Sequence, residues 1–190
     1  MKVKHNMIIV EGMDNTGKTT LIQRLIREVG RGYLSAMVSL GPNRTLLEQF
    51  HWNDKQIALA KMGGPLTVYD RFLPICDGVY GPIVRKGSLW NINHLVIDQL
   101  LNEVNPLIIY CRPSKTKIIG FEDGRDQMEG VVENAEKLLE SYDEHMAKLK
   151  SMGYTIVEYD YTTNEVKGAN NFDYIAKQVQ NVIKDYYINL

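Results

Sequence analysis

MIIVEGMDNTGKTT, at residues 7–20, joins a short apolar run to a loop rich in glycine and threonine. Residues 12–19 match the pattern G-x-x-x-x-G-K-[S/T], which lies between a strand and a helix in phosphate-binding loops. Leu21, Leu25 and Val29 recur behind the loop at the spacing of one helix face. The sequence therefore predicts a phosphate-binding loop, because chance would place this pattern in only about one such chain in a hundred.

Each residue type in the loop has a physical task. Glycines let backbone N–H groups converge on phosphate oxygens, and the N-terminus of a helix adds roughly half a positive charge. Lys18 is expected to reach the β- and γ-phosphates of ATP, and the hydroxyl of Thr19 to bind Mg²⁺. The candidate ATP-binding residues are Gly12, Asn15, Thr16, Gly17, Lys18, Thr19 and Thr20.

Short apolar runs alternate with helical patterns along the rest of the chain, which is typical of an α/β fold with a mainly parallel sheet. Five strands are expected, at residues 7–11, 33–40, 65–70, 106–111 and 154–159. The apolar stripes of the expected helices are Leu21, Leu25 and Val29; Ile92, Val96, Leu100 and Val104; Ala135, Leu138, Tyr142, Met146 and Leu149; and Phe172, Ile175, Val179 and Tyr186.

Composition narrows the class of protein. The 190 residues are 44% hydrophobic and 24% charged, which is ordinary for one globular domain, here residues 1–190. A net charge of −1 without a long basic run argues against a nucleic acid polymer as partner, and no segment has the apolar length of a membrane span. We expect a cytoplasmic protein, in the host cytoplasm if phage-encoded, in which Cys76 and Cys111 are reduced thiols.

Two motifs together carry a resemblance to a known family. Glu11-Gly12-x-Asp14-x-x-Gly17-Lys18-Thr19-Thr20, followed by Asp70-Arg71-Phe72 after the third expected strand, resembles the thymidylate kinase-like family of P-loop kinases, and its phage members most. Pro42-x-Arg44-Thr45 and Val79-Tyr80-Gly81 are similar to two weaker motifs of that family. The resemblance implies a three-layer P-loop kinase fold with a five-stranded parallel sheet, flanking helices and a mobile lid at about residues 114–130. It also implies ATP as phosphate donor, Mg²⁺ and a deoxynucleoside monophosphate acceptor, and the family's homodimers suggest a dimer.

The resemblance also implies roles at matching positions. Asp14 is expected to contact the sugar 3′-hydroxyl of the acceptor, Arg71 and Arg44 to hold the acceptor's phosphate, and Tyr80 to line the acceptor site. A guanidinium suits phosphate because its N–H groups bind two oxygens at once. Asp70 closes an apolar strand, so it is expected to hold Mg²⁺ together with Thr19, the alternative being an acid that only starts a loop.

Recognition of the base is less defined. Phe50, with Asn53, is similar to a family Phe-x-x-Asn in which the Phe stacks on the acceptor base, but Trp52 could take that role or both aromatic residues could be core. Asp54 and Gly81 stand where the family commonly has a base-reading Arg and Gln. The sequence therefore assigns no base.

The cation that neutralises the transferring phosphoryl group must come from outside the loop. Asn15 stands where some members of the family carry an arginine, and the other branch of the family brings the cation on its lid. The lid region offers Lys115, Lys117 and Arg125. We choose Arg125, in the glycine-bearing stretch 120–130, and the alternative is that it only neutralises neighbouring acids. Lys18, Arg71 and Arg125 are thus the candidate catalytic residues.

Two rival functions differ in what they require. A deoxynucleoside kinase phosphorylates a neutral 5′-hydroxyl and needs a general base, and related nucleoside kinases usually supply a Glu after the second strand. Here Gly41-Pro42-Asn43-Arg44 offers no acid, which favours a monophosphate acceptor. A non-catalytic ATP-binding module is the second rival. Tyr161, after the last expected strand, is either a neighbour of the adenine of ATP or part of a plain exit turn.

Overall fold

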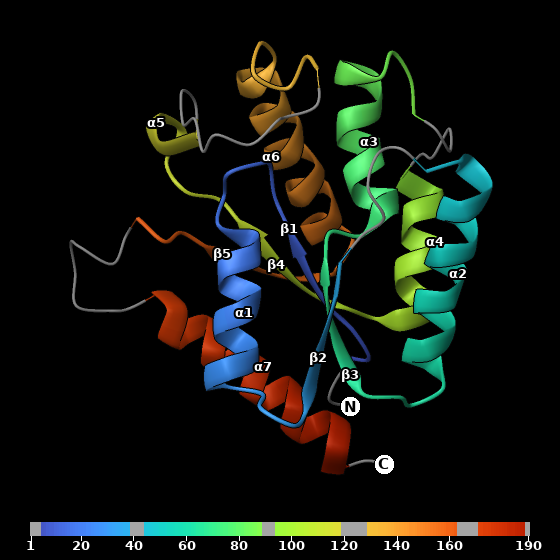
Figure 1. Cartoon of the computed structure of the whole chain (residues 1–190), viewed down its shortest axis with the longest axis vertical. Coiled ribbons are helices and arrows are strands. Elements are labelled where there is room, and N and C mark those ends of the chain that lie inside the picture. The colour runs from blue at the N-terminus through green and yellow to red at the C-terminus, as the bar shows by residue number, and fades with distance from the viewer. Residues whose placement is uncertain (1–4, 39–43, 89–93, 119–128, 163–170, 189–190) are drawn as a thin grey trace.

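The computed structural model describes residues 5–38, 44–88, 94–118, 129–162 and 171–188. Its centre is one five-stranded sheet in the order β2-β3-β1-β4-β5, and every neighbouring pair is parallel (Figure 1). The strands are β1 (Ile8–Glu11), β2 (Leu34–Val38), β3 (Leu66–Asp70), β4 (Leu107–Cys111) and β5 (Thr155–Tyr159). All five strands expected from the sequence are therefore confirmed.

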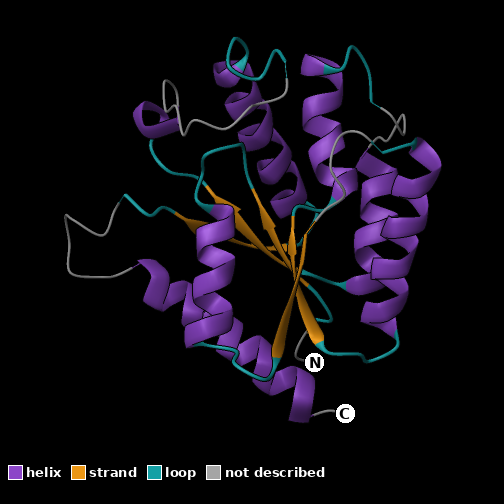
Figure 2. Cartoon of the chain, viewed as in Figure 1, coloured by secondary structure: helices purple, strands orange, loops and turns teal. Residues whose placement is uncertain are grey.

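Helices cover both faces of this sheet (Figure 2). α1 and α7 pack with the apolar residues of one face, and α2, α3, α4 and α6 with those of the other, which gives three layers. The helices are α1 (Lys18–Glu28), α2 (Leu46–Lys61), α3 (Leu73–Val84), α4 (His94–Val104), α5 (Lys115–Ile118), α6 (Ala135–Ser151) and α7 (Asn171–Ile188). None of these described helices combines the length and the apolar character needed to cross a membrane.

The central strands explain why the sheet forms. β1 reads IIVE and β4 reads LIIYC, and every residue of both strands is buried. A parallel sheet covered by helices on both faces buries both sides of its strands, so continuous rather than alternating apolar runs are expected there. The one charged residue of these two strands is Glu11, at the carboxyl end of β1.

Three expectations about helices need correction. α3 was missed because its sequence, LPICDGVYGPIV, carries two prolines and two glycines, yet Pro74 lies in the first turn, where no N–H is needed. Cys76 consequently lies inside a buried helix, and it is a free thiol, as is Cys111. In α4 the buried residues are Ile97, Leu101 and Val104.

The buried face of α4 therefore differs from the expected one by one residue along most of the helix. Val96 is 40% exposed and Leu100 only partly buried, because the helix turns the next residues toward the core. Ile92, the first residue of that expected stripe, lies outside the described residues. α2 was not expected as a helix either, although Thr45 and Glu48 form a complete capping box at its start.

The register of the sheet places the candidate site. Val10 of β1 pairs with Asp70 of β3, and the backbone N–H of Arg71 donates to the carbonyl oxygen of Val10 at 2.9 Å. The loop after β1 and the exit of β3 therefore lie side by side at the carboxyl edge of the sheet. In such sheets ligands bind at this edge.

Candidate active site at the carboxyl edge of the sheet

The phosphate loop has the backbone conformation that its glycines allow. Gly12 has a φ of 141° and Gly17 a φ of 81°, and Asn15 also lies at positive φ, 64°. A Cβ on Gly12 would come within 2.6 Å of the carbonyl oxygen of Cys111 and 2.9 Å of the Thr16 hydroxyl. Glycine is thus required at position 12 by space as well as by φ.

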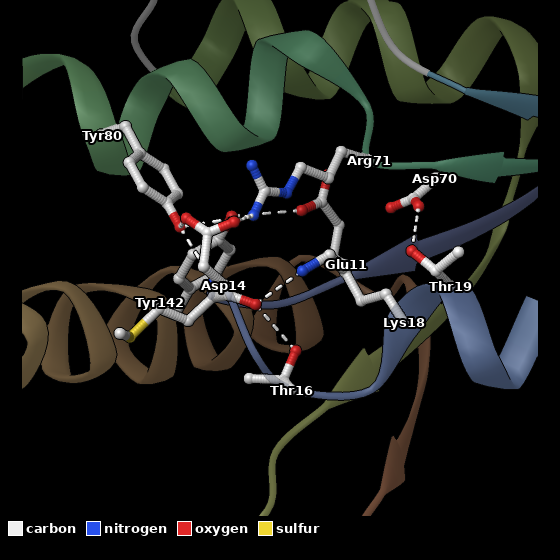
Figure 3. Close-up of polar contacts among 10 residues, drawn as sticks. Glu11, Asp14, Thr16, Lys18, Thr19, Asp70, Arg71, Tyr80 and Tyr142 are labelled. Atoms are coloured by element: carbon white, nitrogen blue, oxygen red, sulfur yellow. Dashed lines mark hydrogen bonds and ion pairs between the residues drawn. The ribbon is translucent and has the colours of Figure 1, made fainter. Parts of the chain in front are cut away.

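Lys18, the first residue of α1, is folded back over the loop (Figure 3). Its Nζ donates to the carbonyl oxygen of Met13 at 2.5 Å, and the buried hydroxyl of Thr16 donates to the same oxygen at 2.8 Å. Burial lowers the pKa of Lys18 to about 8, and the positive charge of Arg71 adds to this while the carboxylate of Asp14 opposes it. A bound polyphosphate would favour the charged ammonium again.

Thr19 and Asp70 lie together, as expected. The Thr19 hydroxyl donates to Oδ2 of Asp70 at 3.1 Å. A hydroxyl and a carboxylate are hard oxygen ligands, and Mg²⁺ in phosphate-loop proteins uses such a pair together with waters and phosphate oxygens. The two residues therefore fit Mg²⁺, although the described residues contain no cluster of three or more His, Cys, Asp or Glu that would hold a metal without substrate.

Asp14, Arg71 and Tyr80 form one connected cluster beside the loop (Figure 3). Nη2 of Arg71 donates to Oδ1 of Asp14 at 2.6 Å, and the Tyr80 hydroxyl donates to Oδ2 of Asp14 at 2.8 Å. The guanidinium also lies over the Tyr80 ring, 5.2 Å from its centroid. Although burial opposes ionisation, the charges of Arg71 and Lys18 lower the pKa of Asp14, so this carboxylate is ionised.

The backbone at Arg71 is unusual for a residue with a side chain. Its φ is 68°, in the left-handed region that non-glycine residues seldom adopt. Such a conformation persists only where the surroundings hold it. Here the N–H of Arg71 is bonded to Val10 and the following N–H, of Phe72, is bonded to a side chain of β1.

That side chain belongs to Glu11, which the sequence analysis did not single out. Glu11 has no exposed surface, and its Oε1 accepts the N–H of Phe72 at 2.6 Å while its Oε2 accepts the hydroxyl of Tyr142 at 3.3 Å. Burial raises the pKa of Glu11 to about 7, against the opposing effects of the Phe72 N–H and the Arg71 charge. The available signal was an acid inside the otherwise apolar strand IIVE.

Comparisons with known proteins agree with this geometry. No protein-family model matches the sequence, and no curated protein matches it significantly. In structure the chain is similar to YorR of Bacillus subtilis, solved in complex with phosphorylated GDP, with a TM-score of 0.67, 17% identity and coverage of 94% of this chain and 95% of that one. It is also similar to a deoxyadenosine kinase from M. mycoides with bound dATP, with a TM-score of 0.57, 19% identity and coverage of 91% of this chain and 98% of that one. A third similar structure is the thymidylate kinase of Candida albicans, with a TM-score of 0.54, 14% identity and coverage of 98% of this chain and 95% of that one. The chain has a P-loop kinase fold.

Within this P-loop kinase fold, Tyr161, two residues after the end of β5, lies at the phosphate loop. A Cβ on Gly17 would come within 3.2 Å of the Tyr161 ring. Asp160 meanwhile accepts both the N–H and the hydroxyl of Thr162, at 2.7 and 2.5 Å. The stretch is thus a hydrogen-bonded exit turn that also brings Tyr161 against the phosphate loop, and a contact between Tyr161 and adenine stays a prediction.

Other candidate residues lie at the start of α1 and in or just before α2. Arg44 is 56% exposed in its side chain and pairs with Glu48 at 3.4 Å, one turn into α2. Phe50 is 39% exposed, which excludes a core role, while Trp52 is half-buried. Thr20 is exposed on the first turn of α1.

The candidate lid cations are only partly visible. Lys115 and Lys117 lie on the short helix α5, and Lys115 forms an ion pair with Glu136 of α6. Arg125 lies outside the described residues, as does most of the stretch 120–130. Its role therefore stays a prediction.

Proposed function

We propose that this chain transfers the γ-phosphate of ATP to the phosphate of a deoxynucleoside monophosphate, yielding ADP and the nucleoside diphosphate. The observation that carries the proposal is the Asp14–Arg71–Tyr80 cluster beside the phosphate loop. It offers a planar cation for a second phosphate and a carboxylate for a sugar hydroxyl within one connected network.

In this proposal the protein positions two anions and stabilises charge. The phosphate loop and Lys18 hold the β- and γ-phosphates, while Arg71 turns from Asp14 toward the acceptor's phosphate. Thr19 and Asp70 would hold Mg²⁺, which would neutralise the charge of the phosphates. No proton has to be removed from the acceptor, because a monophosphate with a second pKa near 6 is already ionised at neutral pH.

The alternative is a deoxynucleoside kinase acting on the 5′-hydroxyl, because the chain is also similar in structure to a deoxyadenosine kinase. Such an enzyme needs a carboxylate that reaches the hydroxyl. The pKa of Glu11, about 7, would suit a base, but this side chain has no exposed surface and its two oxygens are bonded to Phe72 and Tyr142. The ionised Asp14 is committed to Arg71 and Tyr80, and these contacts favour the monophosphate.

The experiment is ADP formation from ATP in the presence of nucleosides and, separately, of their monophosphates. The proposal expects ADP formation that depends on a deoxynucleoside monophosphate. Dependence on a nucleoside instead would establish the alternative. ADP formation that no acceptor increases, or none at all despite ATP binding, would leave a nucleotide-binding module.

A further inference from the structure

The buried face of α2 changes character along the helix. Toward its end it carries Ile57 and Ala60, which belong to the apolar core. Toward its start the same face carries three buried amides, Gln49, Asn53 and Gln56, exposed by 4%, 1% and 3%. Amides are seldom buried without a reason, because each one carries a donor and an acceptor that need partners.

Asn53 stands out among these amides. Neither its side-chain nitrogen nor its side-chain oxygen has a hydrogen-bond partner among the described residues. An unpaired buried polar group destabilises a fold by the full cost of removing it from water. A side chain that imposes this cost on the free protein is a candidate for a group that pairs with a ligand.

Contacts on either side of Asn53 locate it along the sheet. One turn later, the carbonyl oxygen of Gln56 accepts the hydroxyl of Tyr69 in β3 at 3.4 Å. One turn earlier, the Gln49 amide donates to the carbonyl oxygen of Arg44 at 2.9 Å. Asn53 thus lies inside α2, between the turn that contacts Arg44 and the turn that contacts Tyr69, the last residue but one of β3 at the carboxyl edge of the sheet.

This edge also carries the proposed acceptor site. Tyr69 is two residues before Arg71, whose Nε is likewise buried and has no partner among the described residues. If the acceptor's phosphate binds at Arg71 and its sugar at Asp14, the base extends away from the phosphate loop. In this arrangement the base would meet the buried polar residues of α2.

We propose that Asn53 reads the base of the acceptor nucleotide through its side-chain amide. This inference rests on the proposed function and deepens it. A carboxamide presents a donor beside an acceptor, which matches the paired donor and acceptor on the edge of a nucleobase. Because the amide has no partner among the described residues, a base that fails to match it leaves the amide unpaired, and the mismatch is penalised.

The test combines base preference with stability in Asn53→Leu and Asn53→Asp, two replacements of similar size. Turnover would be measured with dAMP, dCMP, dGMP and dTMP, and stability by thermal melting without ligand. For the best acceptor, kcat/KM should fall by about fivefold to 150-fold in both variants, and the ratio between best and worst acceptor should shrink. ATP affinity should not change.

Melting separates a reading role from a structural one. Asn53→Leu removes a buried amide that has no partner in the described part of the chain, so the free variant should melt about 2–4 °C above the wild type. Asn134→Ala is the control, because the Asn134 amide donates to the carbonyl oxygen of Gly130 at 2.8 Å and its loss should lower the melting temperature without changing base preference.

Each outcome bears on a different claim. An unchanged base ratio in both Asn53 variants, or a lower melting temperature for Asn53→Leu, would overturn the role of Asn53 while leaving the kinase activity in place. Failure of the wild type to phosphorylate any of the four monophosphates would overturn the proposed function, and this inference with it. A loss of base preference in Asn53→Asp, which keeps a polar side chain of similar size, would show that the amide itself is needed. The melting temperatures show whether each variant folds.

Discussion

The guanidinium of Arg71 and the carboxylate of Asp14 lie 2.6 Å apart, although 57 residues separate them in the sequence. One follows β3 and the other lies in the loop after β1, and the parallel pairing of these two strands brings them together. The contact holds the guanidinium beside the phosphate loop, to which Asp14 belongs. A phosphate that binds there would compete with Asp14 for the same N–H groups.

Arg71→Ala should therefore weaken acceptor use far more than ATP binding. A charge-assisted hydrogen bond contributes about 1.5–3 kcal/mol, so kcat/KM for the acceptor should fall at least about tenfold. Arg71→Lys keeps the charge but loses the planar fork, and it should recover only part of the loss. Steady-state kinetics and ATP titration measure both effects. Loss of ATP binding with acceptor binding intact would mean that the two sites are assigned in reverse.

The lid cation can be identified from turnover rates alone. Arg125→Ala should lower kcat at saturating substrates by about 10³ or more, since arginine fingers contribute in that range. Lys115 already pairs with Glu136, so Lys115→Ala should have little effect, and Lys117→Ala provides a second comparison. A loss below about tenfold for Arg125→Ala would make it an ordinary surface charge and transfer the role to another residue.

Glu11 should make stability fall as pH rises toward neutrality. Burial raises its pKa in the folded state to about 7, above the ordinary value of 4.5, so the folded protein holds the proton more tightly than the unfolded chain. The contribution is complete below about pH 4.5 and is lost as pH rises through 7. Urea unfolding of the wild type and Glu11→Gln should show a difference that changes by up to about 3 kcal/mol across this window. A pH-independent difference would contradict this placement of the proton.

His145 should act in the opposite direction. Burial lowers its pKa to about 4, and the neighbouring ring of His94, 4.8 Å away, adds to the shift. The unfolded chain then binds more protons between pH 6.5 and 4, so the stabilising effect of neutral His145 is lost as pH falls through that window. His145→Phe should remove up to about 3 kcal/mol of this acid sensitivity, whereas the exposed His51→Gln should not. Equal acid sensitivity in all three proteins would refute the assignment.

The sequence predicted those parts of the molecule in which local pattern and tertiary structure agree. β1, the phosphate loop and α1 follow one another as the glycines and the helical stripe indicate. The pairing of Thr19 with Asp70 also followed from the sequence, because parallel strands end at one edge, where Asp70 closes β3 and the phosphate loop after β1 leads to Thr19.

The remainder depended on contacts that no local pattern contains. α3 forms despite its prolines and glycines because its buried residues pack against the core and against α6, where the rings of Tyr80 and Tyr142 meet edge to face. Glu11 was overlooked because one acid at the end of an apolar strand resembles a loop residue. Its structural role depends on a tertiary contact, because its Oε1 accepts the N–H of Phe72 at 2.6 Å.

Transfer of labelled γ-phosphate from ATP tests the central claim most directly. The protein would be incubated with γ-labelled ATP and one deoxynucleoside monophosphate at a time, and the products separated. We predict label in the nucleoside diphosphate with the wild type and none with Lys18→Ala, which should keep its circular dichroism spectrum while losing the charge at the β- and γ-phosphates. Label that appears only in a monophosphate made from an added nucleoside, or only in inorganic phosphate, would contradict the account.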